Sequence, residues 1–533
     1  MKKKNKGQIS IYVCAMLCVF LMLVLTVLQG IQISEGRAKC NQAVAAATDS
    51  IKGDYQPDLF RRYHILALDQ TYYGRGEGYL EERAIEFLEY NLNPDKGMYR
   101  FNVEEVLLSD TKGLTDNDLM PLKQQIAEYM KLKLPLEVLE TVFHKAEDSN
   151  SCSEKKGLSA ELDGLESLGE DSDFSMETLE NPTSESLRLL GVEDILASQG
   201  MGDMENVTFE ELAGLKLTEQ GVLENPQNII SEWSKSDILQ IVIPEQAGSI
   251  SKETVALQNP TSSKGTGNNQ GSGKSSDRNI QNIMDITRML SEDRFQESLN
   301  HLPTATEELY GIAYALDSFQ HFGTDSREEA ESEYHALACE IEYLLAGQAS
   351  DYENLTKIAE ELSLIRFVPN VLYAFSNDEM KEAAMLLATL ILAPVGLEGA
   401  AEPVSYVFLA CWAYAESLLD VRCLLLGETV PLVKDKDTWK LSLSGMQNLV
   451  SKDASGCEQS KGMNYEEYLA VLLAIMPEQS QKYNRMLDVM QFNIQEGIPG
   501  FKMKNCIYEF RLQAEISEGR NTWFLEGTGS YLP

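Results

Sequence analysis

A long uncharged apolar segment near the N-terminus is the feature that most constrains this chain. Residues 7–34 contain no Asp, Glu, Lys or Arg, and residues 9–28 are almost wholly apolar. A helix needs about 20 apolar residues to cross a bilayer, whereas the apolar part of a cleavable signal peptide has roughly 7–15. We therefore expect a transmembrane helix that contacts the lipid bilayer through residues 9–33, anchored by Ile9, Ile11, Val13, Leu17, Phe20, Leu21, Leu25 and Leu28.

The charges around this segment predict its orientation. Positive residues that flank a membrane span stay on the cytoplasmic side, and the short N-terminal side carries Lys2, Lys3, Lys4 and Lys6. We therefore expect a single-pass protein of the cell membrane with a cytoplasmic N-terminus and an extracytoplasmic C-terminal region. Cleavage is the alternative, because the small residues at 45–47 could suit a signal peptidase. That site lies far beyond the apolar block, and charges intervene at Glu35, Arg37 and Lys39.

The overall charge limits the possible partners. The 533 residues include 83 Asp and Glu against 45 Lys and Arg, which gives a formal net charge of −38. Phosphate backbones repel such a polyanion, so nucleic acid is not an expected partner. Hydrophobic residues make up 43% of the chain, which is ordinary for globular protein and argues against wholesale disorder. A chain of this length accommodates about two to four domains.

The residue types that usually carry chemistry form no recognisable constellation. The nine cysteines include no C-x-x-C pair, and their spacing does not indicate a set of disulfide bonds. The five histidines form no H-E-x-x-H motif, and the sequence has neither a G-x-S-x-G elbow nor a P-loop. His335 and Cys339 stand four apart, and we interpret them as neighbours on a packed helix face. The sequence thus predicts no catalytic, cofactor-binding or metal-ligating residues, no cofactor and no enzyme activity.

The apolar helix is expected to continue beyond the membrane as a stalk, since Val44, Ala47 and Ile51 repeat at helical spacing. A glycine-rich turn at 74–78 and a helix over about 79–91 follow. Residues 99–104 then alternate as in a half-buried strand, and residues 504–516 alternate in the same way before a turn at 519–521 and a second run at 522–525. We expect these distant segments to form one small sheet.

The middle of the chain divides into poorly ordered and helical parts. Residues 148–244 are expected to be an acidic, weakly ordered insert with short helices at most, and residues 245–278 a flexible Gly/Ser linker. Helices then follow, and three of them carry capping signals at Ser326, Ser350 and Asn464. An apolar pair at about 383–392 and 404–426 could be a second membrane passage, but its charged residues favour a buried helical hairpin.

The predicted fold class is mainly α with a small antiparallel β-sheet (α+β), and an N-terminal transmembrane helix continues into a stalk. The predicted segments are a tail and transmembrane helix (1–34), a stalk helix with a small α+β region (35–147), the acidic insert (148–244), the linker (245–278), a helical domain (279–455), and helices with a C-terminal β-hairpin (456–533).

Several short segments carry a family resemblance. Near the N-terminus these are Lys6–Tyr12, Leu28–Ala38 and Leu59–Asp69. Further along they are Gln124–Lys131, Glu340–Gly347, Asn354 with Leu355, Ile365–Asn370, Ala413–Arg422 and Val430–Lys434. Together these segments resemble an uncharacterised family of bacterial single-pass membrane proteins similar to TadE and TadG. The resemblance covers most of the chain outside roughly 148–278. One departure is that Tyr12 stands where type IV pilins carry a glutamate, five residues past a glycine.

The resemblance implies a structural or assembly component of a tight-adherence (Flp-type) pilus or related secretion apparatus. Its partners would be other membrane proteins of that machine, and the resemblance implies no catalytic residues. Because of the departure at Tyr12, we expect the anchor to stay unprocessed in the membrane. The alternative is an anchored extracytoplasmic hydrolase that acts on cell wall or polysaccharide through a pair of carboxylates. A sensor is a weaker possibility, since the cytoplasmic tail is too short for a signalling module.

Overall fold

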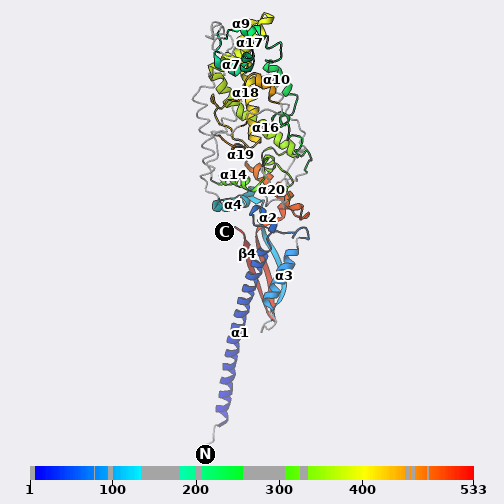
Figure 1. Cartoon of the computed structure of the whole chain (residues 1–533). Coiled ribbons are helices and arrows are strands. Elements are labelled where there is room, and N and C mark those ends of the chain that lie inside the picture. Colours follow the sequence, from blue (N-terminus) through cyan, green and yellow to red (C-terminus); the bar gives the residue numbers. More distant parts are fainter. Residues whose placement is uncertain are drawn as a thin grey trace, which may run out of the picture. The chain divides into compact units, whose positions relative to one another are not determined.

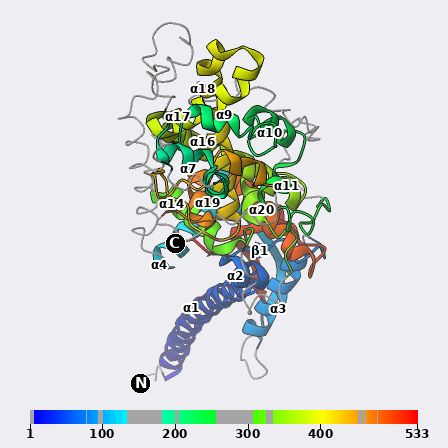
Figure 2. The ribbon, with the colours of Figure 1, turned by 45° about the horizontal axis from the view of Figure 1, so that its top comes forward.

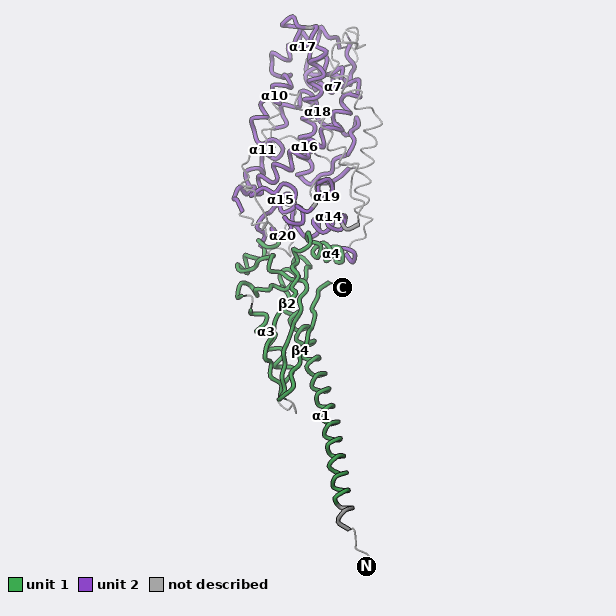
Figure 3. The backbone as a smooth tube through the Cα atoms, turned by 180° about the vertical axis from the view of Figure 1, so that it is seen from behind, with its two compact units in different colours: residues 1–129, 490–533 green, residues 130–489 purple. Residues whose placement is uncertain are grey.

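The computed structural model describes residues 6–76, 78–93, 100–133, 181–199, 204, 207–255, 306–323, 334–450, 457, 462–476 and 479–532. The chain forms two compact units, coloured separately in Figure 3. Unit 1 combines Met1–Tyr129 with Met490–Pro533, and unit 2 is Met130–Val489. Unit 1 is a long helix with a small sheet, and unit 2 is helical. The predicted fold class, mainly α with a small antiparallel sheet, is confirmed.

The sheet of unit 1 joins the two ends of the chain, as predicted. Among the described residues it contains β1 (Leu68–Asp69), β2 (Asn102–Gly113), β3 (Cys506–Glu518) and β4 (Asn521–Ser530). β3 pairs antiparallel with each of the others, and β3 and β4 form a hairpin. The alternating residues of β3 are buried as expected, namely Cys506, Tyr508, Phe510, Leu512, Ala514 and Ile516.

β2 is longer than the sequence predicted. The expected alternation at 99–104 covers only its start, and Tyr99 lies outside the described residues. The strand continues to Gly113 through irregular register, including a break between Ser109 and Lys112 next to Asp110, whose φ is +49°. An irregularity of this kind shifts side chains between the two faces of a strand. The period-two pattern is therefore lost beyond residue 104.

Helix α1 (Lys6–Gly53) is continuous from the apolar segment into unit 1, so the predicted stalk is present (Figures 1 and 2). Its second half packs against β4 and α3 (Tyr79–Leu92). The buried face of α1 consists of Cys40, Ala43, Val44, Ala47, Thr48 and Ile51, and that of α3 of Leu80, Ala84, Leu88 and Leu92. Between α1 and α3 the chain turns at Gly74 (φ +85°) and Gly76 (φ +134°), as the glycine-rich motif predicted.

Two glycines let α1 approach the sheet closely. A Cβ at Gly36 would lie 3.0 Å from the Trp523 ring, and a Cβ at Gly527 would collide with Thr48 Oγ1. At the far end of the same contact, the Tyr531 hydroxyl donates a 2.8 Å hydrogen bond to the Lys52 carbonyl. The contact between α1 and β4 therefore extends from residue 36 to residue 52.

Unit 2 is built around three long helices, α16 (Asp351–Ser376), α17 (Asp378–Leu392) and α18 (Ala401–Leu425). α18 packs against both of the others (Figure 2). The remaining described helices of at least seven residues that lie within this unit are α7 (Ser184–Leu190), α10 (Pro226–Trp233), α14 (Thr306–Ser318), α15 (Glu340–Ala346) and α19 (Tyr465–Ile475). α20 (Gln479–Gln495) begins in this unit.

Two of the predicted helix starts are confirmed. The Ser350 side chain accepts a hydrogen bond from the Glu353 amide at the start of α16, and Asn464 forms a reciprocal capping box with Glu467 at the start of α19. Ser326 lies outside the described residues. The predicted buried hairpin is also confirmed, because 78% of the most apolar stretch of α18 is buried although that helix is long and apolar enough to cross a membrane.

The second half of the acidic insert contains helices that are short, as expected from the sequence, but that have buried faces. Residues 148–180 lie outside the described residues, but the part from 181 to 244 contains short helices with buried faces, including α7, α8 (Glu193–Ser198), α9 (Phe209–Gly214), α10 and α11 (Ile238–Val242). Their stability comes from partners distant in sequence. The Thr183 amide and hydroxyl, for example, both donate to the Glu382 carboxylate of α17. Of the predicted linker, residues 245–255 are described, and the rest lies outside.

The close approach of α1 to β4 predicts a specific stability pattern. Gly527→Ala should lower the free energy of unfolding of unit 1 by about 1–3 kcal/mol, because the new methyl group collides with Thr48. Thr48→Ala in the same chain removes the colliding oxygen and should restore much of the loss. Thermal unfolding of the detergent-solubilised protein, followed by circular dichroism, measures both effects.

Gly53→Ala is the control for this substitution, since a Cβ at Gly53 meets no atom within 4 Å. It should leave the unfolding curve nearly unchanged. Equal effects of Gly527→Ala and Gly53→Ala, or no recovery with Thr48→Ala, would contradict the packing described for α1.

Candidate functional site

The first half of α1 exposes an unbroken apolar surface. The described anchor residues are all exposed, from 50% for Leu21 and Leu28 to 70% for Ile11. Ile9 and Lys6 lie in the helix, and Lys2, Lys3 and Lys4 lie outside the described residues. The helix is long and apolar enough to cross a membrane. A surface of this kind is unfavourable in water and is typical of a segment that contacts lipid.

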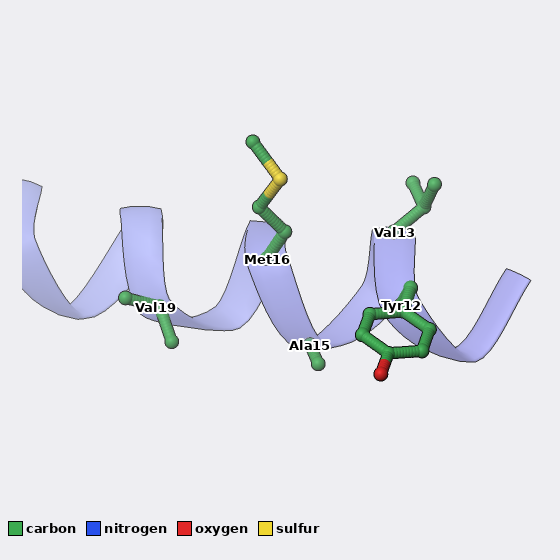
Figure 4. Close-up of a pocket in the computed structure, with 5 residues that line it drawn as sticks. All are labelled: Tyr12, Val13, Ala15, Met16 and Val19. Carbon is green, nitrogen blue, oxygen red and sulfur yellow. The ribbon is translucent and has the colours of Figure 1, made fainter. Parts of the chain in front are cut away.

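Figure 4 shows a shallow depression on this segment, lined by Tyr12, Val13, Ala15, Met16 and Val19. All five residues come from two successive turns of α1 itself. The lining is almost entirely apolar, so the depression offers no group for acid–base or metal chemistry. It is part of the exposed apolar surface of α1.

Unit 2 contains a second notable arrangement, a buried charge network formed by Arg366, Glu416, Asp420 and Lys434. Lys434 Nζ lies 2.7 Å from Asp420 Oδ1 and 2.8 Å from Glu416 Oε1. Arg366 Nη2 lies 3.0 Å from Asp420 Oδ2. The four side chains are at most 4% exposed. Two cations thus face two anions, and the network is neutral as a whole.

Hydrogen bonds to neutral groups complete this network. Arg366 Nη1 donates to the Tyr468 hydroxyl at 3.0 Å and to the Leu432 carbonyl at 3.1 Å. The Asn370 amide donates to Asp420 Oδ2 at 3.1 Å. Glu416 accepts from the backbone amides of residues 440 and 441. Helices α16, α18 and α19 and the segment 430–441 are therefore joined at one buried point.

The network holds Asp420 and Lys434 in their charged forms. Burial by itself raises the pKa of the Asp420 carboxyl, but the attraction of Lys434 and Arg366 outweighs burial and leaves that pKa below its usual value. For Lys434, burial lowers the pKa, and the carboxylates of Asp420 and Glu416 raise it above its usual value. Groups locked in this way are poor proton donors or acceptors, so the arrangement serves stability better than catalysis.

The sequence contains a signal for buried charge pairs in α18. Glu416, Asp420 and Arg422 interrupt an otherwise apolar helix, a pattern that predicts a buried hairpin but does not identify the network. A charge inside a buried apolar helix requires a partner. Arg422 has such partners, because it donates to the carbonyls of Ile241, Val242 and Leu449. The partners of Arg422 lie 27 to 181 residues away in sequence and could not be identified from spacing.

The interpretation of His335 and Cys339 is wrong in one respect. They do not share a helix face, because α15 begins at Glu340 and Cys339 is its N-cap residue. His335 Nδ1 lies 3.0 Å from Glu340 Oε1, and Cys339 is buried. Among the described residues, no group of three or more His, Cys, Asp and Glu side chains is placed to hold a metal ion.

A disulfide bond joins Cys423 at the end of α18 to Cys457. The spacing of the cysteines had not revealed this pair. The bond joins the two ends of the segment 423–457, and this segment contains Lys434 of the buried charge network. Cys14 and Cys18 are exposed free thiols on α1, and Cys40, Cys339, Cys411 and Cys506 are buried free thiols.

The acid with the clearest unusual titration is Asp488 of α20. Burial raises the pKa of this carboxyl to about 7, although the Tyr343 hydroxyl donates to it at 3.3 Å and the charge of Arg485 acts in the opposite direction. A raised pKa means that the folded chain binds more protons than the unfolded chain between roughly pH 4 and pH 7. The stability of unit 2 should therefore fall as the pH rises through this window.

Asp488→Asn should remove this pH dependence, because the amide keeps the hydrogen bond from Tyr343 without an ionisable group. We expect a gain on the order of 2 kcal/mol in the free energy of unfolding at pH 8, and a flatter profile between pH 4 and pH 7. Urea unfolding at a series of pH values tests this. The exposed acid Glu496, changed to Gln, is the control. A profile that Asp488→Asn leaves unchanged would contradict the assignment.

Removal of one cation from the buried charge network should be strongly destabilising. Lys434→Met leaves Glu416 without its buried cation and Asp420 with only Arg366, and we expect a loss of about 3–5 kcal/mol in the free energy of unfolding. Lys436→Met is a matched control two residues away. Lys436 is 61% exposed in its ion pair with Glu185, so its loss should cost less than about 1 kcal/mol. Similar losses for the two variants would contradict the account.

Comparisons with known proteins identify a family but no activity. No curated protein and no solved structure matches the chain. The model of a family described as "Family of unknown function (DUF5702)" matches residues 216–518, more than half of the chain. The matched part includes the buried charge network and all of β3. The chain therefore belongs to the DUF5702 family, whose function is unknown.

Proposed function

We propose that this protein is a membrane-anchored, extracytoplasmic structural or assembly component of a pilus-like (tight-adherence, Flp-type) or related secretion apparatus. The observation that carries the proposal is the form of α1. Its first half is an exposed, uncharged apolar helix, and the same helix continues without interruption into the core of unit 1. A membrane segment built into a folded domain in this way suits a component that must be held at the membrane.

Three features support the proposed orientation. Lys2, Lys3, Lys4 and Lys6 precede the apolar segment, as expected of a cytoplasmic end. A disulfide such as Cys423–Cys457 persists in oxidising compartments and is rare in the cytoplasm. The strongly acidic character of the remaining chain keeps an exported domain soluble near anionic lipid headgroups. Together they favour a cytoplasmic N-terminus and extracytoplasmic units.

The assignment to a pilus-like machine rests on the resemblance to TadE-like and TadG-like proteins. Three of the segments that carry this resemblance, Ile365–Asn370, Ala413–Arg422 and Val430–Lys434, supply the buried charge network. The residues involved contribute to the interior of the fold and not to an open cleft. Because the segments that carry the resemblance stabilise the interior of the fold, they favour a structural role over an enzymatic one.

The alternative, a carboxylate-dependent hydrolase, has less support. A glycoside hydrolase needs two carboxyl groups about 5–10 Å apart facing its substrate. The paired acids Glu416 and Asp420 are instead buried and bound to Lys434 and Arg366. Asp488 has a raised pKa, but it is buried at 4% exposure. We therefore do not propose this activity.

Gene deletion in the source bacterium tests the proposal. Loss of the protein should abolish or strongly reduce surface pili, seen by electron microscopy, and adhesion to a solid surface. The full chain supplied in trans should restore both. A version in which residues 35–533 follow a cleavable signal peptide should be secreted but should not restore them, because it lacks the anchor.

The Lys436→Met chain is a suitable control in this experiment, since it carries an exposed substitution and keeps the anchor. It should complement the deletion fully. Normal pili and adhesion in the deletion strain would contradict the proposed function, whatever the location of the protein.

A further inference from the structure

The turn end of the β3–β4 hairpin lies beside the predicted membrane segment. Figures 1 and 3 both show this end directed along α1 toward the N-terminus. Trp523 of β4 packs over Gly36, and Glu518 of β3 also approaches Gly36. Gly36 lies only two positions after Ser34, the last residue of the uncharged segment 7–34. The hairpin therefore reaches the level at which the apolar surface of α1 begins.

The turn extends beyond that level. β4 runs alongside α1 in the same direction, because Trp523 contacts Gly36 and Gly527 contacts Val44 and Thr48 further along both elements. At about 3.3 Å per strand residue, Arg520 in the turn lies roughly 10 Å further toward the N-terminus than Trp523. At about 1.5 Å per helix residue, this places the turn near the level of Gly30. Gly30 belongs to the uncharged segment.

The uncharged segment matches a complete bilayer. Residues 7–34 form a helix roughly 42 Å long, and a bilayer including its headgroup layers is about 40–45 Å thick. A turn level with Gly30 would thus lie several ångströms inside the outer boundary of the membrane. That position is the headgroup layer and not the hydrocarbon core.

The side chains at this end of unit 1 suit a headgroup layer. Arg520 in the turn and Arg100, which precedes β2, are both exposed. Phe524 is 75% exposed on the sheet face that points away from α1, although its neighbours Trp523 and Leu525 are buried. Guanidinium groups form strong bidentate hydrogen bonds with phosphate, and aromatic residues are enriched where a protein meets the membrane surface.

We propose that the turn end of the β3–β4 hairpin is seated in the lipid headgroup layer, where Arg520 and Arg100 bind phospholipid phosphates. This inference rests on the proposed anchoring of α1. It adds a second membrane contact, on one side of the helix, that fixes the rotation and tilt of α1. The close packing of Trp523 on Gly36 makes the contact rigid, because hairpin and helix move together.

Fluorescence quenching in vesicles tests the proposal with a matched pair of positions. Thr522 and Thr528 are exposed residues of the same type on the same strand and face, but Thr528 lies roughly 20 Å further from the turn. Each is changed to Cys in the full-length chain and labelled with an environment-sensitive dye. The background carries Cys14→Ala, Cys18→Ala and Cys152→Ser, and its other described free cysteines are buried. The vesicles contain phosphatidylethanolamine, phosphatidylglycerol and a headgroup-spin-labelled phosphatidylcholine as the quencher.

The dye at Thr522→Cys should be quenched several-fold more strongly than the dye at Thr528→Cys. A third reporter, Ile33→Cys on α1, separates this inference from the proposed anchor. Strong quenching at Ile33→Cys with equally weak quenching at Thr522→Cys and Thr528→Cys would overturn the seated hairpin alone. Absence of quenching at Ile33→Cys would overturn the anchor, and the seated hairpin with it.

Charge reversal tests the phosphate contacts. Arg100→Glu with Arg520→Glu should lower the quenching at Thr522→Cys toward the value at Thr528→Cys and leave that at Ile33→Cys unchanged. Arg61→Glu is the control, since Arg61 is an exposed arginine of unit 1 in α2 (Pro57–Tyr63), and it should have no effect. Unchanged quenching in the double variant, with a normal thermal unfolding curve, would overturn the assignment of the two arginines to lipid phosphate.

Discussion

The packing of one face of α1 against the sheet is the interaction on which the arrangement of unit 1 depends. A 48-residue helix could act as a loose tether if only its tip touched the folded domain. Here the buried face extends from Gly36 to Ile51, and two glycines, Gly36 and Gly527, permit the close approach. The direction of the apolar half is therefore fixed relative to the sheet, because both halves belong to one continuous helix.

Unit 2 is stabilised by a different device. Its interior contains charged side chains, and an unpaired buried charge lowers the free energy of unfolding by several kcal/mol. These side chains therefore stabilise the unit only when all of them are paired. Arg366, Asp420 and Lys434 come from α16, α18 and a later segment, and the observed packing of these elements pairs them all. The Cys423–Cys457 bond limits the freedom of that later segment. We interpret the network as a means of selecting one arrangement of apolar helices that could otherwise slide past one another.

The sequence predicted those features that depend on local patterns. The apolar segment, the stalk at Val44, Ala47 and Ile51, the hairpin at 506–525 and the caps at Ser350 and Asn464 each follow from spacing within a few residues. The pairing of β2 with β3 was also predicted, because both strands alternate and both lie outside the helical part of the chain. The second half of β2 was missed because its irregular register removes the alternation.

Features that depend on distant partners could not be predicted. Helices α10 and α11 are too short for a periodic signal, and they are held in part by buried residues such as Trp233 and by Arg422. The disulfide and the buried charge network join residues whose proximity is a result of the fold. The charges within α18 indicated that buried partners exist but did not identify them. The two cations and two anions of the network cancel, so the net charge of the chain gives no sign of it.

The most direct test of the account is the state of the chain in the cells that produce it. Carbonate-washed membranes should retain the protein, and mass spectrometry should find the N-terminal peptide intact. A protease added to intact cells should digest both units and leave a protected fragment around residues 7–34. Recovery of a shortened chain from the culture fluid, beginning after the apolar segment, would contradict the central claim that an uncut helix holds this protein in the membrane.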